Sequence, residues 1–210
     1  MSDYYPIMLN VRDQRCVVIG GGEVAERKVI AFLECGAAVC VISPNISPEL
    51  RRLCDDRQIQ VINRDYRTGD LSNALVAIAA TDDPNVNASV FSEGKEKGIL
   101  TNVVDDPEKS TFIVPSMLRR GDLLISISTS GRSPALARKI RTELEQQYGP
   151  EYALLAEIIS EVRSEIKDGG IHVDSETWQK SMNIDKLLAL LRKGDAKGAK
   201  EQLITALQRK

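Results

Sequence analysis

The sequence predicts an α/β fold, in which a parallel sheet covered by helices comes first and helices alone come last. Over the first half of the chain, short apolar runs such as 15–20 and 37–42 alternate with helical patterns. A cluster of glycines lies directly between the first apolar run and the first helical pattern. From residue 151 onward, every pattern is helical. These observations favour a sheet domain followed by a helical domain.

The first half is expected to contain five strands with helices between them. An extended opening at 4–11 and a turn at 13–14 precede the first strand. The strands are expected at 15–20, 37–42, 59–62, 75–80 and 99–104, and the helices at 23–35, 48–56 and 84–97. Asp83 is placed to cap the helix 84–97. Alternating strands and helices of this length build βαβ units with a parallel sheet.

The pattern changes after the fifth strand. Strands are expected at 111–114 and 123–128, joined through 117–122, and the second alternates apolar and polar residues. Such alternation suits a half-exposed antiparallel sheet or a subunit interface, which indicates a small α+β region. A helix with Pro134 in its first turn is expected to run to 147. Further helices are expected at 151–167, 175–182, 184–193 and 195–209.

The glycine cluster has the form G-x-G-x-x-A, with Gly20, Gly22 and Ala25 at the three small positions. Gly20 allows a tight turn, and Gly22 lets a pyrophosphate approach the backbone closely. Ala25 lets the helix pack near the strand, so that its N-terminal N–H groups face the phosphates. A tight turn without a ligand would use the same glycines. The flanking strand and helix favour a Rossmann-type dinucleotide site.

The end of the second strand leaves the choice between NAD and NADP open. A standard NAD site has an acidic residue there, whereas this chain has Ser43, Pro44 and Asn45. Ser43 or Asn45 would bond the ribose as neutral groups. Arg51 and Arg52, one helical turn further on, are candidates to reach a 2′-phosphate.

Asp105 is the candidate catalytic residue. It follows the fifth strand, and Thr81 follows the fourth, so both are expected at the sheet edge where α/β proteins bind ligands. A carboxylate at this place can accept a proton while a hydride leaves to a nicotinamide. The like charge of Asp106 would raise a carboxyl pKa if both groups were enclosed. The alternative is that the two acids only cap the turn before Pro107.

A serine-rich loop at 126–133 has no nearby His or Lys base, so its hydroxyls suit a polar ligand better than nucleophilic catalysis. Several basic residues surround it and would attract a polyanionic small molecule, although each would also suit a solvated helix face. They are Arg119, Arg120, Arg132, Arg138, Lys139 and Arg141.

Composition narrows the class of protein. A net charge of −2 argues against a nucleic-acid or membrane surface, and no apolar run approaches the length that spans a bilayer. The four cysteines form no C-x-x-C pair, and His172 is the one histidine, so no metal site is expected. Cysteines of this kind fit a reducing cytoplasm.

Motifs spread along the chain carry a family resemblance. In order they are 20–28 (GGGEVAERK), 79–83 (AATDD), 102–105 (NVVD), 112–116 (FIVPS) and 130–138 (SGRSPALAR). Together they resemble the precorrin-2 dehydrogenase / sirohydrochlorin ferrochelatase family, the N-terminal module of siroheme synthases. The resemblance is close over about 3–145 and extends to the helical tail only in general character.

The resemblance implies NAD-dependent oxidation of precorrin-2 to sirohydrochlorin in siroheme biosynthesis, by an interwoven homodimer. It divides the chain into a dinucleotide-binding domain (1–113), a dimerisation region (114–149) and a helical domain (150–210). The essential aspartate of the family falls on Asp105. The cofactor contacts fall on Gly22, Glu23, Val24, Ser43, Pro44, Asn45 and Thr81. The polycarboxylate substrate would be bound by the serine–arginine group, Ser128, Ser130, Arg132 and Arg138.

Two other functions remain open at this point. One is an NAD-sensing binding module without turnover, whose helical tail signals to a partner. The other is a chelatase alone, with the glycine loop as a relic. The sequence also leaves open whether the dehydrogenase inserts iron into sirohydrochlorin. Chelatases that use paired histidines are excluded by the single His172.

Overall fold

The computed structural model describes residues 4–208, so residue 209 of the last expected helix lies outside the described residues. The chain forms two compact units, 1–114 and 115–210. The expected further division at 149/150 stays a prediction.

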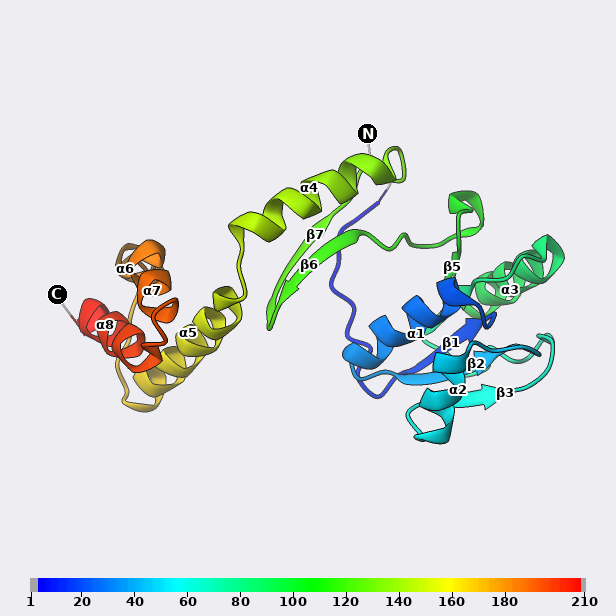
Figure 1. The fold of residues 1–210 in the computed structure, drawn as a ribbon, viewed down its shortest axis with the longest axis horizontal. Helices are drawn as coiled ribbons and strands as arrows, with labels where there is room; N and C mark the ends of the chain where they lie inside the picture. Colours follow the sequence, from blue (N-terminus) through cyan, green and yellow to red (C-terminus); the bar gives the residue numbers. More distant parts are fainter. Residues whose placement is uncertain (1–3, 209–210) are drawn as a thin grey trace. The chain divides into compact units, whose positions relative to one another are not determined.

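The first unit is built on a five-stranded parallel sheet with the order β3-β2-β1-β4-β5 (Figure 1). Its strands are β1 (Arg15–Ile19), β2 (Ala38–Ile42), β3 (Gln60–Ile62), β4 (Val76–Ala79) and β5 (Leu100–Val103). Its helices are α1 (Glu23–Glu34), α2 (Pro48–Asp55), α3 (Pro84–Lys97) and the short 3₁₀ helix η1 (Pro107–Lys109). The strand order reverses between β1 and β4, and α/β sheets bind ligands at such a switch point. The predicted Rossmann-type sheet is confirmed.

Both faces of this sheet are buried. Val18 of β1 packs into one core with Val29 of α1 and Leu50 of α2. The neighbouring residue, Val17, packs into a second core with Val90 of α3. Alternate residues of a strand point to opposite faces, so a strand covered on both sides reads as an uninterrupted apolar run.

Local signals fix the ends of the helices. Asp83 accepts hydrogen bonds from the N–H groups of Asn85 and Val86, so the predicted cap of α3 is confirmed. Gly98 ends the same helix in the left-handed conformation, at φ +67°. Ser47 caps α2 through the N–H of Leu50.

The second unit begins with an antiparallel pair, β6 (Ser116–Arg120) and β7 (Leu123–Ile127). The expectation of a strand at 111–114 joined through 117–122 is wrong. Gly121 and Asp122 form a two-residue turn between Arg120 and Leu123, with Gly121 at φ +57°. Tight hairpins favour glycine at such a position, so the pairing extends back over 116–120 instead.

The segment before that hairpin is irregular, although Phe112, Ile113 and Val114 are apolar. It is attached to β5 through Phe112, whose carbonyl accepts from Nδ2 of Asn102 over 3.1 Å, and through Thr111, whose N–H donates to the carbonyl of Thr101 over 2.7 Å. The Oγ1 of Thr111 in turn accepts from the N–H of Thr101. Pro115 follows and has no N–H to donate, so the apolar run does not continue as a strand.

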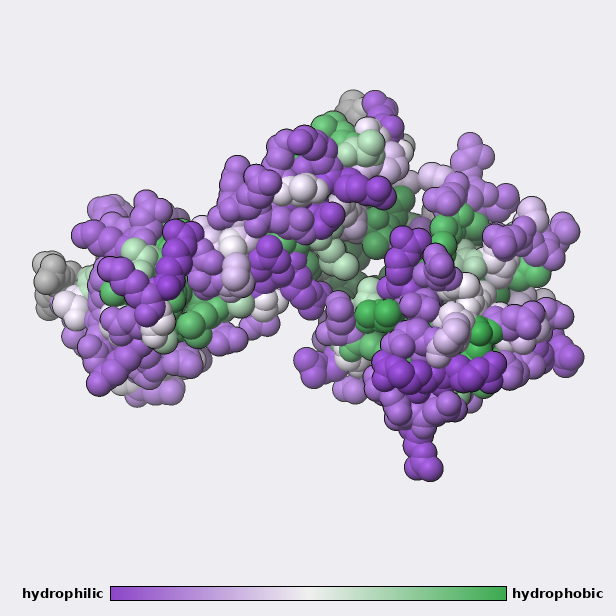
Figure 2. Space-filling view, viewed as in Figure 1, coloured by the Kyte–Doolittle hydropathy of each residue, from purple (hydrophilic) through white to green (hydrophobic). Residues whose placement is uncertain are grey.

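The rest of the second unit is helical, as predicted. Its helices are α4 (Pro134–Gln147), α5 (Glu151–Asp168), α6 (Ser175–Ser181), α7 (Ile184–Leu191) and α8 (Ala196–Gln208). The last four enclose one core, in which Val162, Leu187 and Leu203 are fully buried. Their outer surface is mainly hydrophilic (Figure 2). Across residues 4–208, no helix combines the length and the apolar character that a membrane crossing requires.

Candidate functional site

A cavity of about 470 Å³ opens at the carboxyl end of the sheet in the first unit. Its walls come from the segments that follow four strands. They are Gly20–Val24 after β1, Ser43 and Pro44 after β2, Asp65 and Tyr66 after β3, and Ala80–Asp83 with Val86 after β4. The volume lies in the range of small-molecule and cofactor sites. Of the predicted cofactor contacts, Gly20, Gly22, Glu23, Val24, Ser43, Pro44 and Thr81 therefore surround one space.

The three glycines of the loop have different roles. Gly20 has φ +116°, and a Cβ on it would lie 2.1 Å from the carbonyl oxygen of Ala80. A Cβ on Gly21 would lie 1.9 Å from the carbonyl oxygen of Asn45. A Cβ on Gly22 would meet no atom within 4 Å. The protein's own backbone requires the first two glycines, whereas the third leaves free space beside the cavity.

Gly21 was not among the predicted site residues, because the fingerprint treats its position as variable. The strand-to-helix loop after β1 lies against the loop after β2, and the N–H of Ser47 donates to the carbonyl of Gly21 over 2.8 Å. This close approach excludes any side chain. The signal available in the sequence was the run of three glycines where the fingerprint needs two.

Gly22 is also the N-cap of α1, and it has no side chain with which to cap the helix. The first N–H groups of a helix have no partner within the helix. In α2 and α3, by contrast, Ser47 and Asp83 satisfy such groups. The N-terminus of α1 thus presents N–H donors and a positive dipole end beside the space at Gly22, which suits a phosphate.

The end of β2 is shaped by Ser43. Its side chain is buried, and its Oγ donates to the carbonyl of Asn45 over 2.6 Å. Asn45 does not line the cavity, so its predicted role as a cofactor contact stays a prediction. Neither Arg51 nor Arg52 lines the cavity, and Arg52 is ion-paired with Glu49 and Asp56 on its own helix. Their suggested contact with a 2′-phosphate has no support in this geometry.

Thr81, at the end of β4, is held from the next helix. Its Oγ1 donates to Oδ1 of Asn87 over 2.9 Å, and Nδ2 of Asn87 donates to the carbonyl of Thr81 over 3.0 Å. This pair of bonds fixes the backbone between β4 and α3 where it borders the cavity. Thr81 is therefore oriented by α3.

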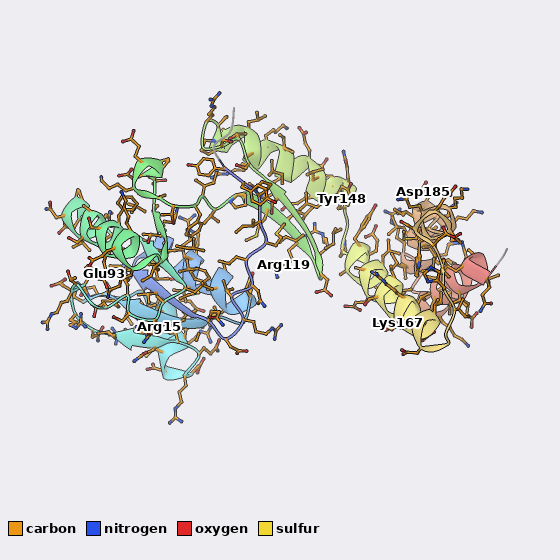
Figure 3. The ribbon with its side chains drawn as sticks, turned by 180° about the vertical axis from the view of Figure 1, so that it is seen from behind. Arg15, Glu93, Arg119, Tyr148, Lys167 and Asp185 are labelled. Atoms are coloured by element: carbon orange, nitrogen blue, oxygen red, sulfur yellow. The ribbon has the colours of Figure 1, made fainter. Side chains whose placement is uncertain are left out.

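The loop after β3 carries two wall residues that sequence analysis did not assign, Asp65 and Tyr66. A buried acid on α3, Glu93, anchors this loop (Figure 3). Its carboxylate accepts from the Tyr66 hydroxyl, from the N–H of Gly69 at 2.9 Å and from the N–H of Leu71 at 3.3 Å. Lys97 adds an ion pair at 2.8 Å. The available signal was an acidic residue on the buried side of a helix, three positions after Val90.

The charge state of this anchor follows from its partners. Burial opposes ionisation of Glu93, yet the bonds from Lys97, Tyr66 and Gly69 together hold the pKa of its carboxyl below the ordinary value. Burial raises the pKa of the Tyr66 hydroxyl, and its bond to Glu93 raises it further. Tyr66 is therefore the donor and Glu93 the ionised acceptor at neutral pH.

Asp105 stands at the end of β5, in a turn closed by a bond from the N–H of Asp106 to the carbonyl of Val103. It is exposed, it is not part of the cavity wall, and its φ is +59°. In turns with positive φ at the third position, glycine or asparagine is usual. The chain thus places a free carboxyl group in a backbone conformation that most side chains avoid.

The neighbours of Asp105 differ from those expected. The two acids are not enclosed together, because Asp105 is exposed, so the condition for a rise from like charge is not met. The bond from Lys109 holds the pKa of Asp106 below its ordinary value. On α1, Lys28 has a pKa lowered by burial and by Arg27, while the negative charge of Asp105 opposes that fall. Lys28, which sequence analysis gave no role, is therefore an electrostatic neighbour of Asp105.

In the second unit, the serine-rich loop is folded on itself ahead of α4. The N–H of Ser130 donates to the Oγ of Ser128 over 3.0 Å. Several basic side chains of the cluster are engaged elsewhere: Arg120 donates to the carbonyl of Tyr148, Lys139 pairs with Glu143, and Arg141 pairs with Glu145. Arg132 and Arg138 are exposed. The serine–arginine group stays a predicted substrate site. Within residues 4–208, no group of three or more His, Cys, Asp or Glu side chains is arranged to hold a metal ion.

Comparison with known proteins agrees with this geometry. The family model described as "Putative NAD(P)-binding" matches residues 7–116, and the one described as "Sirohaem biosynthesis protein central" matches 120–147. The chain thus carries a domain of the kind that binds a nicotinamide cofactor.

Similar curated proteins are siroheme synthases. Siroheme synthase 1 of Aeromonas salmonicida is 34% identical over 95% of this chain and 43% of its own length. The siroheme synthase of Methylobacillus flagellatus is 41% identical over 77% of this chain and 35% of its own length. The chain spans less than half the length of these relatives. Among solved structures, SirC, a precorrin-2 dehydrogenase, superposes with a TM-score of 0.78 at 27% identity, covering 95% of this chain and 98% of that one.

Proposed function

The chain belongs to the family of siroheme synthases and precorrin-2 dehydrogenases, and on this premise we propose that it oxidises precorrin-2 to sirohydrochlorin with NAD. The observation that carries the proposal is the free space at Gly22. Two adjacent glycines are packed against backbone, whereas this one leaves room beside the uncapped start of α1. That combination fits a pyrophosphate.

The residues of the cavity would hold the cofactor in a defined direction. Gly22, Glu23 and Val24 would receive the pyrophosphate at the start of α1. Ser43 and Pro44, together with Asn45, would border the adenosine half. Thr81 on the other side of β1 would border the nicotinamide half, towards β5. When bound, the nicotinamide supplies the hydride acceptor.

NAD is favoured over NADP by the charges of the cavity wall. Among the described residues that form it, four are acidic and none is Lys or Arg: Glu23, Asp65, Asp82 and Asp83. A 2′-phosphate needs a basic partner, commonly an arginine. The wall would repel that phosphate and accept a ribose hydroxyl.

Asp105 would accept the proton that leaves the ring as the hydride departs. Oxidation of precorrin-2 removes one hydride and one proton. The nicotinamide would accept the hydride and Asp105 the proton, so the reaction needs no further acceptor. The exposed carboxyl group at the end of β5, on the ligand-binding end of the parallel sheet, supports this role. Lys28 on α1 is an electrostatic neighbour of this carboxylate.

The substrate and the assembly are part of the same proposal. Precorrin-2 is a polycarboxylate, and the exposed Arg132 and Arg138, with Ser128 and Ser130, would bind its carboxylates. A homodimer formed through the β6–β7 hairpin is supported by exposed apolar side chains at Val114, Met117 and Leu136. None of the four cysteines, all within the described residues, forms a disulfide, which supports a cytoplasmic location. Iron insertion into sirohydrochlorin stays a prediction.

The test is anaerobic conversion of precorrin-2, with NADH formation followed by absorbance. Stoichiometric NADH and sirohydrochlorin are expected. A Gly22→Asp variant would fill the free space with a negative charge and abolish both NAD binding and turnover, while its melting curve stays unchanged. NAD binding by the wild type without any turnover would instead identify a nucleotide-sensing module.

A further inference from the structure

The expected partner of an NAD ribose is missing from its usual place. In Rossmann sites, an acidic residue at the end of the second strand bonds the ribose hydroxyls. Here that strand ends at Ser43, whose hydroxyl hydrogen is already donated to the carbonyl of Asn45. Ser43 is neutral, so an acidic acceptor for the ribose hydroxyls would have to come from another element.

An acidic residue follows the neighbouring strand, β3. β3 pairs with β2 in parallel, with Ile62 opposite Ile42, so the two strands end at the same level. The N–H of Ser43 donates to the carbonyl of Ile62 over 3.2 Å, which ties the two ends together. Asp65 follows β3 by three residues and lines the cavity with Ser43 and Pro44.

The carboxylate of Asp65 is not committed to another contact. Within residues 4–208, its side chain makes no hydrogen bond or ion pair, although four other acids of this region do. Its backbone carbonyl, in contrast, accepts a bond of 2.9 Å from Arg64. A free acidic group in the wall of a cofactor cavity is available to a ligand.

The loop that carries Asp65 is held firmly. Arg64 forms two parallel bonds of 2.7 Å with the carboxylate of Asp70, and Glu93 binds Tyr66 and the backbone beyond it. A group presented by a preorganised loop needs little ordering when a ligand binds. The position of Asp65 beside Ser43 is thus a property of the folded unit.

We propose that Asp65 is the residue that selects NAD: it accepts hydrogen bonds from the adenosine ribose hydroxyls and repels a 2′-phosphate. The inference rests on the proposed nicotinamide-dependent function. Asp65, in the loop after β3, would take the role that the acidic residue at the end of the second strand has in the usual fingerprint. Tyr66, next in sequence, lines the same cavity.

The test compares the binding of NAD and NADP to the full chain by titration calorimetry. The wild type is expected to prefer NAD by more than about tenfold, since a hydrogen bond to a charged group is worth at least that factor. Asp65→Asn is expected to shift the ratio of the two affinities toward NADP by about tenfold. Asp65→Arg is expected to reverse the preference. Both variants keep their fold because the side chain is exposed.

The matched control is Asp55→Asn, which removes the same charge from an exposed position on α2 that does not line the cavity. It is expected to change the ratio by less than about threefold, because Asp55 lies outside the cavity wall. If Asp65→Asn and the control shift the affinity ratio equally, or if the ratio is unchanged in the Asp65 variants, Asp65 does not select NAD. The proposed nucleotide site would be unaffected by either result. Failure of the wild type to bind either nucleotide would overturn the proposed function itself.

Discussion

The carboxylate of Glu93 accepts a hydrogen bond of 2.9 Å from the backbone N–H of Gly69. A buried acid on α3 therefore fixes a loop that forms one wall of the cavity. The same carboxylate accepts a hydrogen bond from the Tyr66 hydroxyl and forms an ion pair with Lys97, which compensates its negative charge. The cavity owes its shape to this contact as much as to the glycine loop.

Replacing Glu93 by alanine is expected to lower the free energy of unfolding by about 1 to 3 kcal/mol, because buried N–H and hydroxyl donors lose their acceptor. Urea denaturation measures this change. Glu96→Ala on the exposed side of the same helix is the control, with an expected change within about 0.5 kcal/mol. Equal effects of the two substitutions would remove Glu93 from this role.

The contribution of Glu93 is also expected to depend on pH. Its pKa in the folded protein lies below the ordinary value of the unfolded chain, so ionised Glu93 stabilises the fold above that ordinary value, about 4.3. The stabilisation is lost as the pH falls through the lower folded pKa. The difference in unfolding free energy between wild type and Glu93→Gln should therefore be largest near neutral pH and shrink below about pH 4. A difference that grows in acid would contradict the assignment.

Adjacent glycines of the loop are expected to respond differently to alanine. In Gly21→Ala the new methyl group collides with the carbonyl of Asn45, and a loss of about 2 to 3 kcal/mol is expected. In Gly22→Ala it meets open space, so stability should change by less than about 0.5 kcal/mol while NAD affinity falls. Thermal melting with and without NAD separates the two effects. A stable Gly21→Ala variant would show that the two loops do not touch as described.

Substrate binding is expected to depend on Arg138 and not on its neighbour Lys139. Arg138→Ala should raise the KM for precorrin-2 by about tenfold, through the loss of a charge-assisted hydrogen bond, with the KM for NAD unchanged. Lys139→Ala is the control, because Lys139 already pairs with Glu143 over 3.4 Å. Steady-state kinetics under anaerobic conditions measures both. Equal effects on the two substrates would point to a general change in the fold.

The sheet and its ligand-binding edge could be predicted from the sequence because their signals are local. Uninterrupted apolar runs marked β1, β2 and β4, and Asp83 marked the start of α3. The hairpin was predicted in the wrong place because its pairing is decided by the turn at Gly121, whereas the apolar run 112–114 only resembles a strand.

Contacts between distant segments could not be read in this way. The role of Gly21 depends on the approach of the loop that holds Asn45, and Glu93 meets Tyr66 from 27 positions away. The sequence pattern around one of these residues does not indicate which distant residue it will contact. The place of Asp65 beside Ser43 likewise appears only once β2 and β3 are paired.

We propose Asp105 as the group that accepts the proton during oxidation of precorrin-2, and a closely matched aspartate is available as a control. Two aspartates of the first unit share the left-handed conformation, Asp105 at φ +59° and Asp13 at φ +60°, and asparagine tolerates it equally well. Asp13 lies before β1, at the opposite edge of the sheet from the cavity. Asp13→Asn is thus a control with the same backbone, the same exposure and the same loss of charge.

The decisive measurement is the anaerobic turnover of precorrin-2 by Asp105→Asn and Asp13→Asn, with the Kd for NAD determined for each. Loss of a general base is expected to lower kcat by at least about 100-fold in Asp105→Asn, with NAD affinity unchanged, while Asp13→Asn retains full activity. Wild-type turnover by Asp105→Asn would exclude Asp105 as the base that accepts the proton.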